Sequence, residues 1–124
     1  NYIISSGPMI HNCIEAINLM KSKFNIKVGL INVHTLKPLN LKSIKAKLKN
    51  AKNIMVVEDH TFYGGLYSII NDVFRKINLK INLNYIAIND DFVESGKPDE
   101  LEKKYGFAPS DIAKKFYEFY KYSK

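Results

Sequence analysis

Strand-like and helix-like segments alternate along the whole chain, and this alternation constrains its fold more than any other feature. Short apolar runs typical of strands occur at residues 2–5, 26–33, 53–57 and 83–92. They are separated by longer segments whose apolar residues recur every three or four positions, the period of a helix. Such alternation packs helices on both faces of a mostly parallel sheet. The 124 residues suffice for one core, so the sequence predicts a single three-layer α/β/α domain over residues 1–124.

The first two helices are predicted from their turns and from their apolar period. The first follows the turn at Gly7 and Pro8. Its apolar positions keep the helical period, which makes Cys13 and Met20 core candidates; these positions are Ile10, Cys13, Ile14, Ile17, Met20 and Phe24. The second helix is short and begins near Leu41, with Asn40 as its expected N-cap.

Three further helices are predicted in the second half of the chain. One follows the glycine pair at 64–65 and presents Leu66, Ile69, Ile70, Val73 and Phe74 on one side. Another begins at Asp99 and ends at Gly106. Ser110 is expected to cap the last helix, whose predicted inward residues are Ile112, Phe116 and Phe119.

Two strands are predicted in the same half. The continuous apolar run at residues 53–57 suits a central strand buried on both faces, followed by a polar loop over residues 58–63. The other strand is expected around Leu83, Tyr85, Ala87 and Phe92.

Composition places the chain among ordinary globular proteins. Apolar residues make up 46% and charged residues 25%, and no apolar run approaches the roughly 18 residues that a membrane span needs. Cys13 is the only cysteine, so no disulfide framework can form, and a cytoplasmic location is expected. Because the sequence starts at Asn1 and enters a strand at once, we expect it to be part of a larger protein.

The net charge of +7 raises the hypothesis of a nucleic-acid-binding module. The charge comes almost entirely from lysines spread along the chain, since Arg75 is the only arginine. The densest run, at residues 42–52, alternates with Ile44 and Leu48 at helical spacing. That pattern favours the solvated face of an amphipathic helix over a binding patch, so no nucleic-acid partner is predicted.

No self-contained active site can be assembled from the motifs. The three histidines and the single cysteine show no metal-ligand spacing, and no phosphate-binding glycine loop is present. The sequence therefore predicts no catalytic residue, no cofactor-binding residue and no metal ligand within this chain.

Two places remain of interest. His34 follows a strand, and Glu58, Asp59 and His60 leave the buried strand together. A regulatory small-molecule site at the carboxyl edge of the sheet, near Ser6, His34 and His60, is therefore a further hypothesis.

Three local motifs follow one another along the chain in a characteristic order. Residues 32–40 read Asn-Val-His-Thr-Leu-Lys-Pro-Leu-Asn, and residues 56–60 read Val-Val-Glu-Asp-His, followed by Gly-Gly-Leu at 64–66. Residues 94–106 contain Glu-Ser-Gly-Lys-Pro, then Glu-Leu and finally Tyr-Gly. In this order and at these separations, the chain resembles the C-terminal domain of transketolases. Small departures are Asn40 in place of the usual aspartate and Tyr67 in place of a smaller residue.

The resemblance implies a three-layer sandwich on a five-stranded, mostly parallel sheet with one antiparallel strand. It also implies that the complete enzyme moves a two-carbon ketol unit between sugar phosphates. Thiamine diphosphate and Mg²⁺ would be bound by the N-terminal and middle domains, fused to this chain or in a separate subunit, and the complete enzyme is expected to be a homodimer. This chain would then be inactive alone and support assembly.

Related thiamine enzymes are alternatives, namely 1-deoxyxylulose-5-phosphate synthase and the beta subunits of 2-oxo-acid dehydrogenases. Within the resemblance, the motif residues are candidates for contacts with partner domains. They are His34, Lys37, Pro38, Glu58, Asp59, His60, Gly64, Gly65, Glu94, Ser95, Gly96 and Lys97.

Overall fold

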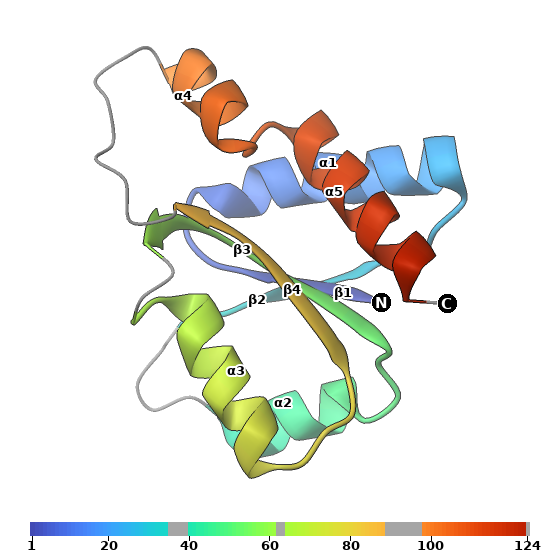
Figure 1. Ribbon diagram of the computed structural model, residues 1–124, viewed down its shortest axis with the longest axis vertical. Helices are drawn as coiled ribbons and strands as arrows, with labels where there is room; N and C mark the ends of the chain where they lie inside the picture. The colour runs from blue at the N-terminus through green and yellow to red at the C-terminus, as the bar shows by residue number, and fades with distance from the viewer. Residues whose placement is uncertain (35–39, 62–63, 89–97, 124) are drawn as a thin grey trace.

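A computed structural model describes residues 1–34, 40–61, 64–88 and 98–123. In these ranges strands and helices alternate as the sequence predicts (Figure 1). The strands are β1 (Tyr2–Ser5), β2 (Gly29–Asn32), β3 (Asn53–Thr61) and β4 (Asn82–Ile88). The helices are α1 (Met9–Phe24), α2 (Leu41–Leu48), α3 (Leu66–Lys76), α4 (Pro98–Tyr105) and α5 (Pro109–Tyr122).

The four described strands form one sheet in the order β2-β1-β3-β4, and every pair is parallel. The register sets Ile3 of β1 beside Leu30 of β2 and Met55 of β3. The predicted α/β class is confirmed. The strand count differs from the expectation, because the described ranges contain four strands and no antiparallel one. A helix lies between each of these strands and the next along the chain. A strand that follows such a helical crossover runs parallel to the strand before it.

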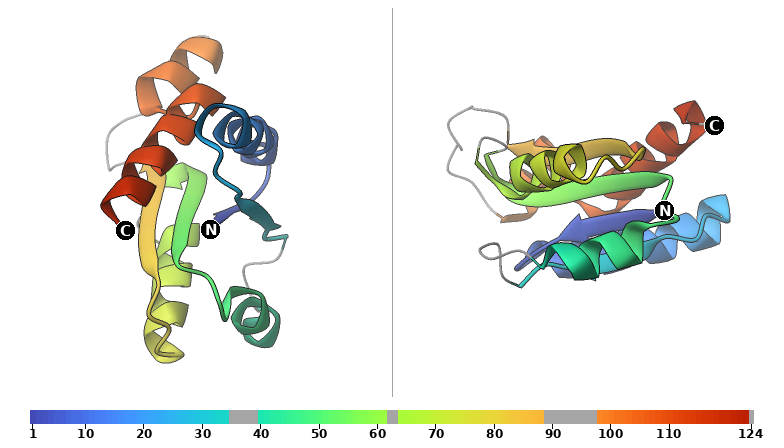
Figure 2. Two further views of the ribbon diagram at one scale, coloured as in Figure 1. Left: turned by 90° about the vertical axis from the view of Figure 1, so that its right-hand side faces the viewer. Right: turned by 90° about the horizontal axis from the view of Figure 1, so that it is seen from below.

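Helices cover both faces of the sheet (Figures 1 and 2). On one face α1 and α5 pack against each other and against the sheet, with Cys13, Met20 and Phe116 fully buried. On the other face α2 and α3 bury Ile44, Leu48 and further apolar residues. The sheet therefore separates two apolar cores, one for each helical layer.

Neighbouring residues of the central strands face opposite cores. In β1, Ile3 joins the α1–α5 core and Ile4 the α2–α3 core. In β3 the same alternation sends Met55 to the first core and Val56 to the second. All four side chains are fully buried, which explains why strands covered on both sides read as continuous apolar runs.

Several predicted element boundaries are corrected. β2 begins at Gly29 rather than at residue 26, and β3 continues to Thr61, so that residues 58–61 belong to the strand and not to a loop. Ser110 does not cap α5, because Ala108 holds the N-cap position and Pro109, with its fixed backbone angle, starts the helix. Ile14, one of the apolar positions of α1, is 45% exposed, because it lies on the outer side of the helix. The last predicted strand residue, Phe92, lies outside the described residues.

The predicted start of α2 is confirmed. The side-chain oxygen of Asn40 accepts a hydrogen bond from the backbone N–H of Ser43 at 3.0 Å. Ile44 is buried while Lys45 is exposed, as expected for an amphipathic helix. Among the described helices, none combines the length and the apolarity that crossing a lipid bilayer requires.

Candidate functional site

The carboxyl ends of β1, β2 and β3 meet at one edge of the sheet, because the strands are parallel. Ser5, at the end of β1, is fully buried, and its hydroxyl donates a hydrogen bond of 2.7 Å to the carbonyl oxygen of Val57 in β3. This hydroxyl therefore ties two strands together and is not presented to a ligand.

Glu58 is almost fully buried and is fixed to the start of α3. Its carboxylate accepts hydrogen bonds from the backbone N–H groups of Leu66 at 2.7 Å and of Tyr67 at 3.0 Å. These donors belong to the first turn of α3, where the N-cap residue Gly65 has no side chain to satisfy them. A carboxylate there is also stabilised by the helix dipole. Glu58 is therefore a capping residue supplied by the neighbouring strand.

Gly64 makes the return to α3 possible. Its φ angle is +70°, in the left-handed region that glycine adopts without the strain that a Cβ atom brings. The predicted motif at 58–66 thus works as one unit: a strand end, a glycine turn and a helix start joined by the Glu58 carboxylate.

A groove lies at the ends of β1 and β2, beside the first turn of α1. Its volume is about 490 Å³, and its lining residues are Ser6, Gly7, Ile10, His11, Asn32, Val33 and His34. His11 and His34 are both exposed, so the structure joins the predicted His34 to a histidine from α1 that the sequence pattern did not connect with it. We call this the His11–His34 groove.

The other predicted site residues are placed as follows. Asp59 is half-buried in β3, and the backbone of His60 also lies in β3. Six predicted residues lie outside the described ranges: Lys37, Pro38, Glu94, Ser95, Gly96 and Lys97. Contacts of the motif residues with partner domains therefore stay a prediction.

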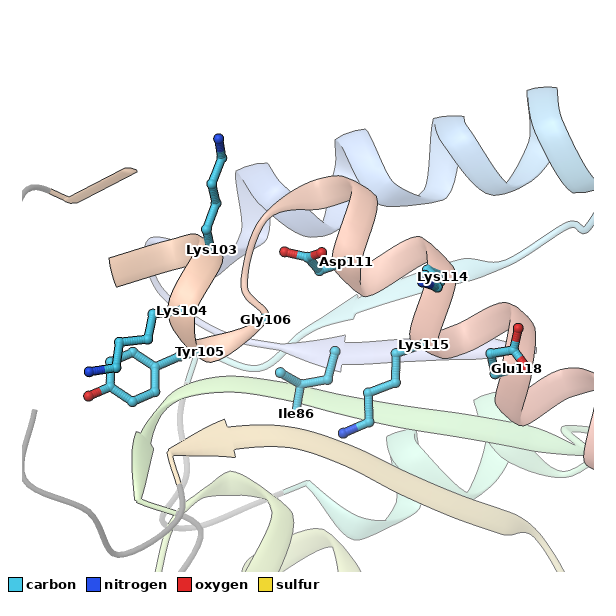
Figure 3. Close-up of a pocket in the computed structure, with 9 residues that line it drawn as sticks. All are labelled: Ile86, Lys103, Lys104, Tyr105, Gly106, Asp111, Lys114, Lys115 and Glu118. Carbon is cyan, nitrogen blue, oxygen red and sulfur yellow. The ribbon is translucent and has the colours of Figure 1, made fainter. Parts of the chain in front are cut away.

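A second groove lies between α4 and α5, next to β4 (Figure 3). Its volume is about 490 Å³, and it is lined by Ile86, Lys103, Lys104, Tyr105, Gly106, Asp111, Lys114, Lys115 and Glu118. The sequence reasoning missed this lysine groove. The available signal was the pair of Lys-Lys steps at 103–104 and 114–115, which fall on two consecutive helices.

Lys115 is held against β4 within the lysine groove. Its ammonium group donates a hydrogen bond of 2.7 Å to the carbonyl oxygen of Tyr85 and lies 5.6 Å from the centre of the Tyr85 ring. Partial desolvation lowers the pKa of this ammonium group below its usual value. Lys115 therefore protects the described edge strand of the sheet as well as lining the groove.

A magnesium-bound diphosphate needs a set of oxygen ligands. Within the residues that the structure describes, no group of three histidine, cysteine or carboxylate side chains is arranged to hold a metal ion. These residues do not fit that cofactor, and no step of thiamine chemistry is derived from them.

Cys13 does not suit a role as a nucleophile either. Burial raises the pKa of its thiol to about 11, against a smaller opposing effect of a hydrogen bond with Ser5. The thiol therefore stays protonated at neutral pH. Cys13 is a core residue, buried between its helix α1 and the sheet.

Comparison with known proteins agrees with this architecture. Residues 2–112 match the family described as "Transketolase, C-terminal domain". The chain belongs to this family. The α/β sandwich described above is thus the fold of a member of this family.

Individual relatives fall into two groups by name. A "Putative transketolase C-terminal section" of Methanocaldococcus jannaschii is 34% identical over 116 residues, which is 94% of this chain and 35% of that protein. A 1-deoxy-D-xylulose-5-phosphate synthase of Clostridium tetani is 30% identical over 112 residues, 90% of this chain and 18% of the enzyme. The chain therefore spans about a third or less of the curated relatives it matches.

A solved structure confirms the fold. The protein described as "Split gene transketolase, inactive beta4 tetramer" superposes with a TM-score of 0.87 at 21% sequence identity. The match covers 99% of this chain and 40% of that one.

Proposed function

We propose that this chain is the C-terminal structural and assembly domain of a thiamine-diphosphate-dependent enzyme of the transketolase type. The observation that carries the proposal is the family match, which extends from residue 2 to residue 112 and so includes nearly every described element. The relatives are two or more times longer than this chain, which supports a division of labour between this domain and others.

In the proposed enzyme, the reaction is transfer of a two-carbon ketol unit between sugar phosphates. Thiamine diphosphate and Mg²⁺ are bound by N-terminal and middle domains, either fused to this chain or carried by a separate subunit. The names of the M. jannaschii relative and of the split-gene transketolase support the separate arrangement. We further propose that the complete enzyme is a homodimer in the cytoplasm. The predicted contact residues are candidates for the surface that meets those domains, namely His34, Lys37, Pro38, Glu58, Asp59, His60, Gly64, Gly65, Glu94, Ser95, Gly96 and Lys97.

A second candidate is the corresponding domain of a 1-deoxyxylulose-5-phosphate synthase. The observation that favours it is the 30% identity to the C. tetani enzyme, close to the 34% identity to the transketolase section. The two candidates share the fold and differ in the product of the complete enzyme.

Calorimetric titration of the purified chain with thiamine diphosphate and MgCl₂ tests the proposed division of labour. We expect no saturable heat and no turnover of ketose phosphates. Saturable binding together with turnover by this chain alone would refute the assembly role.

A reconstituted complex separates the two candidate activities. The chain is combined with the polypeptide that carries the N-terminal and middle domains in the same organism, and the products are identified by mass spectrometry. Two-carbon transfer between sugar phosphates is expected, whereas formation of 1-deoxyxylulose 5-phosphate would select the second candidate.

A further inference from the structure

The lysine groove between α4 and α5 has a fixed frame. The side-chain amide of Asn12 in α1 donates hydrogen bonds of 2.9 Å to the Glu102 carboxylate and to the carbonyl oxygen of Phe107. The backbone N–H of Phe107 in turn donates to the carbonyl oxygen of Glu102 at 2.8 Å, and the Phe107 side chain is buried. The turn between α4 and α5 is therefore tied to α1, so the walls of the groove are held in place before any ligand arrives.

The charge around this groove is predominantly positive. Four lysines line it, against the two carboxylates Asp111 and Glu118. Glu118 is paired with Lys121, outside the lining, at 3.4 Å. In the part of the chain that the structure describes, Lys103 and Lys114 take part in no ion pair. The groove therefore attracts an anion.

The remaining lining adds two other kinds of contact (Figure 3). Ile86 lies at the base, and Tyr105 lies at the end of α4, so both can contact a carbon skeleton. The Asp111 carboxylate is directed toward the turn at Gly106. A carboxylate repels a bare phosphate but accepts hydrogen bonds from hydroxyl groups. Lys103 and Lys104 project from the end of α4, Lys103 away from Ile86 and Lys104 alongside Tyr105. Their flexible stems allow both ammonium groups to turn toward a bound anion.

We propose that the lysine groove binds a small phosphorylated polyol, with the lysines holding the phosphate, Asp111 accepting hydrogen bonds from hydroxyl groups and Ile86 contacting the carbon chain. A volume of about 490 Å³ is in the range typical of sites for small molecules, which favours such a ligand over an acidic polypeptide. The proposal concerns a site separate from thiamine chemistry and does not depend on the proposed function.

NMR titration of the ¹⁵N-labelled chain tests the site directly. Glycerol 3-phosphate is the probe, and n-propyl phosphate, inorganic phosphate and glycerol are its comparison ligands. We expect saturable shifts concentrated at residues 103–118 with glycerol 3-phosphate. Binding of n-propyl phosphate and inorganic phosphate should be at least about threefold weaker, and glycerol should give no shifts.

Two variants of equal charge separate a site from general attraction. Lys103→Gln/Lys104→Gln/Lys114→Gln removes three positive charges from the groove. Lys42→Gln/Lys45→Gln/Lys47→Gln removes three from α2, on the other face of the sheet. The groove variant should bind glycerol 3-phosphate at least about tenfold more weakly, and the α2 variant less than about twofold. Preserved ¹⁵N spectra show that both remain folded.

Asp111→Ala tests the recognition of hydroxyl groups. It should bring the affinities for glycerol 3-phosphate and n-propyl phosphate to within about 1.5-fold of each other, even if both rise because a negative charge is removed. Three results would overturn the proposal: equal losses in the two lysine variants, no preference for the hydroxylated phosphate in the unaltered chain, or binding of polyglutamate in the groove without binding of glycerol 3-phosphate.

Discussion

Single residues connect elements of this fold in ways that sequence spacing conceals. Glu58 satisfies two backbone donors of α3 from a position in β3 eight residues earlier than Leu66. From sequence, Glu58 stood beside Asp59 and His60 as a candidate for a contact with partner domains. Its burial and its two hydrogen bonds show that it is a structural anchor within this chain. A glutamate that caps a helix from an adjacent strand becomes visible only when the strand and the helix are in place.

Replacing Glu58 tests the anchor. Glu58→Ala removes the acceptor of two N–H groups, one buried and one part-buried, and we expect the free energy of unfolding to fall by about 2–4 kcal/mol. Glu58→Gln keeps one acceptor oxygen without the charge and should cost about 1–2 kcal/mol. Urea denaturation measures both. Glu15→Ala, at an exposed position of α1, is the control and should change stability by less than about 0.5 kcal/mol. An equal loss in all three variants would contradict the anchor role.

Cys13 should make the protein sensitive to alkaline pH. Burial raises the thiol pKa from a reference of 9.0 to about 11 in the folded chain. Below pH 9 the thiol is protonated in both states and favours neither. Between pH 9 and about 11 it ionises only in the unfolded chain, so stability falls as pH rises. The loss should reach about 2–3 kcal/mol relative to Cys13→Ala, in which nothing titrates at this position. Parallel pH profiles of the two proteins would disprove this linkage.

At the scale of elements, an aromatic ring of β1 lies against a glycine of the neighbouring strand β2. Tyr2 pairs with Gly29 across the two strands. A Cβ atom added at Gly29 would lie 2.6 Å from Cε1 and 2.7 Å from Cδ1 of the Tyr2 ring. The absence of a side chain at Gly29 therefore lets the Tyr2 ring cover the edge strand.

A double-mutant cycle measures this close approach. Gly29→Ala should destabilise the chain by about 1–2 kcal/mol because the Tyr2 ring must move. With Tyr2→Ala already present, the same substitution should cost at least about 1 kcal/mol less. Thermal or urea unfolding of the four proteins gives the coupling energy. Additive effects would indicate that the ring has room to shift.

Features of the helices could be predicted from sequence where the interaction that causes them spans only a few residues. The Asn40 cap of α2 was predicted correctly, because the interaction spans three residues. The predicted Ser110 cap was wrong, because Pro109 already fixes the first helical residue and places Ser110 inside the first turn. Cys13 and Met20 were assigned to the core correctly. Ile14 shares their helical period and is nevertheless exposed, because the period alone does not tell how wide the covered stripe of α1 is.

For the whole molecule, the alternation of segments and three ordered motifs were enough to predict the sandwich class and the family. The lysine groove was not predicted, and the His11–His34 groove was predicted only in part: its lining includes Ser6 and His34, which the sequence placed at the carboxyl edge of the sheet, but also His11, which it did not. Both grooves are lined by segments distant in sequence. The His11–His34 groove joins the ends of two strands to α1, and the lysine groove joins β4 to α4 and α5. Parallel sheets make such long-range combinations common at their edges.

We expect that this chain does not bind nucleic acid despite its positive net charge. Lys42, Lys45 and Lys47 lie on α2, whereas the lysine groove lies on the other face of the sheet, so the charges do not form one stripe. Fluorescence anisotropy with duplex and single-stranded DNA at low salt should give no saturation below about 10 µM. Micromolar binding that weakens steeply with salt and is lost in the α2 lysine variant would instead establish a nucleic-acid-binding module.

The alternation of neighbouring side chains between the two cores has a mechanical consequence. Because Met55 and Val56 point to opposite layers, inserting or deleting one residue at the start of β3 would turn every following side chain of the strand toward the wrong layer. Length changes in this central strand are therefore tolerated only in steps of two. Because one backbone supplies both cores, a shift of one residue in β3 would disturb the packing of both helical layers at once.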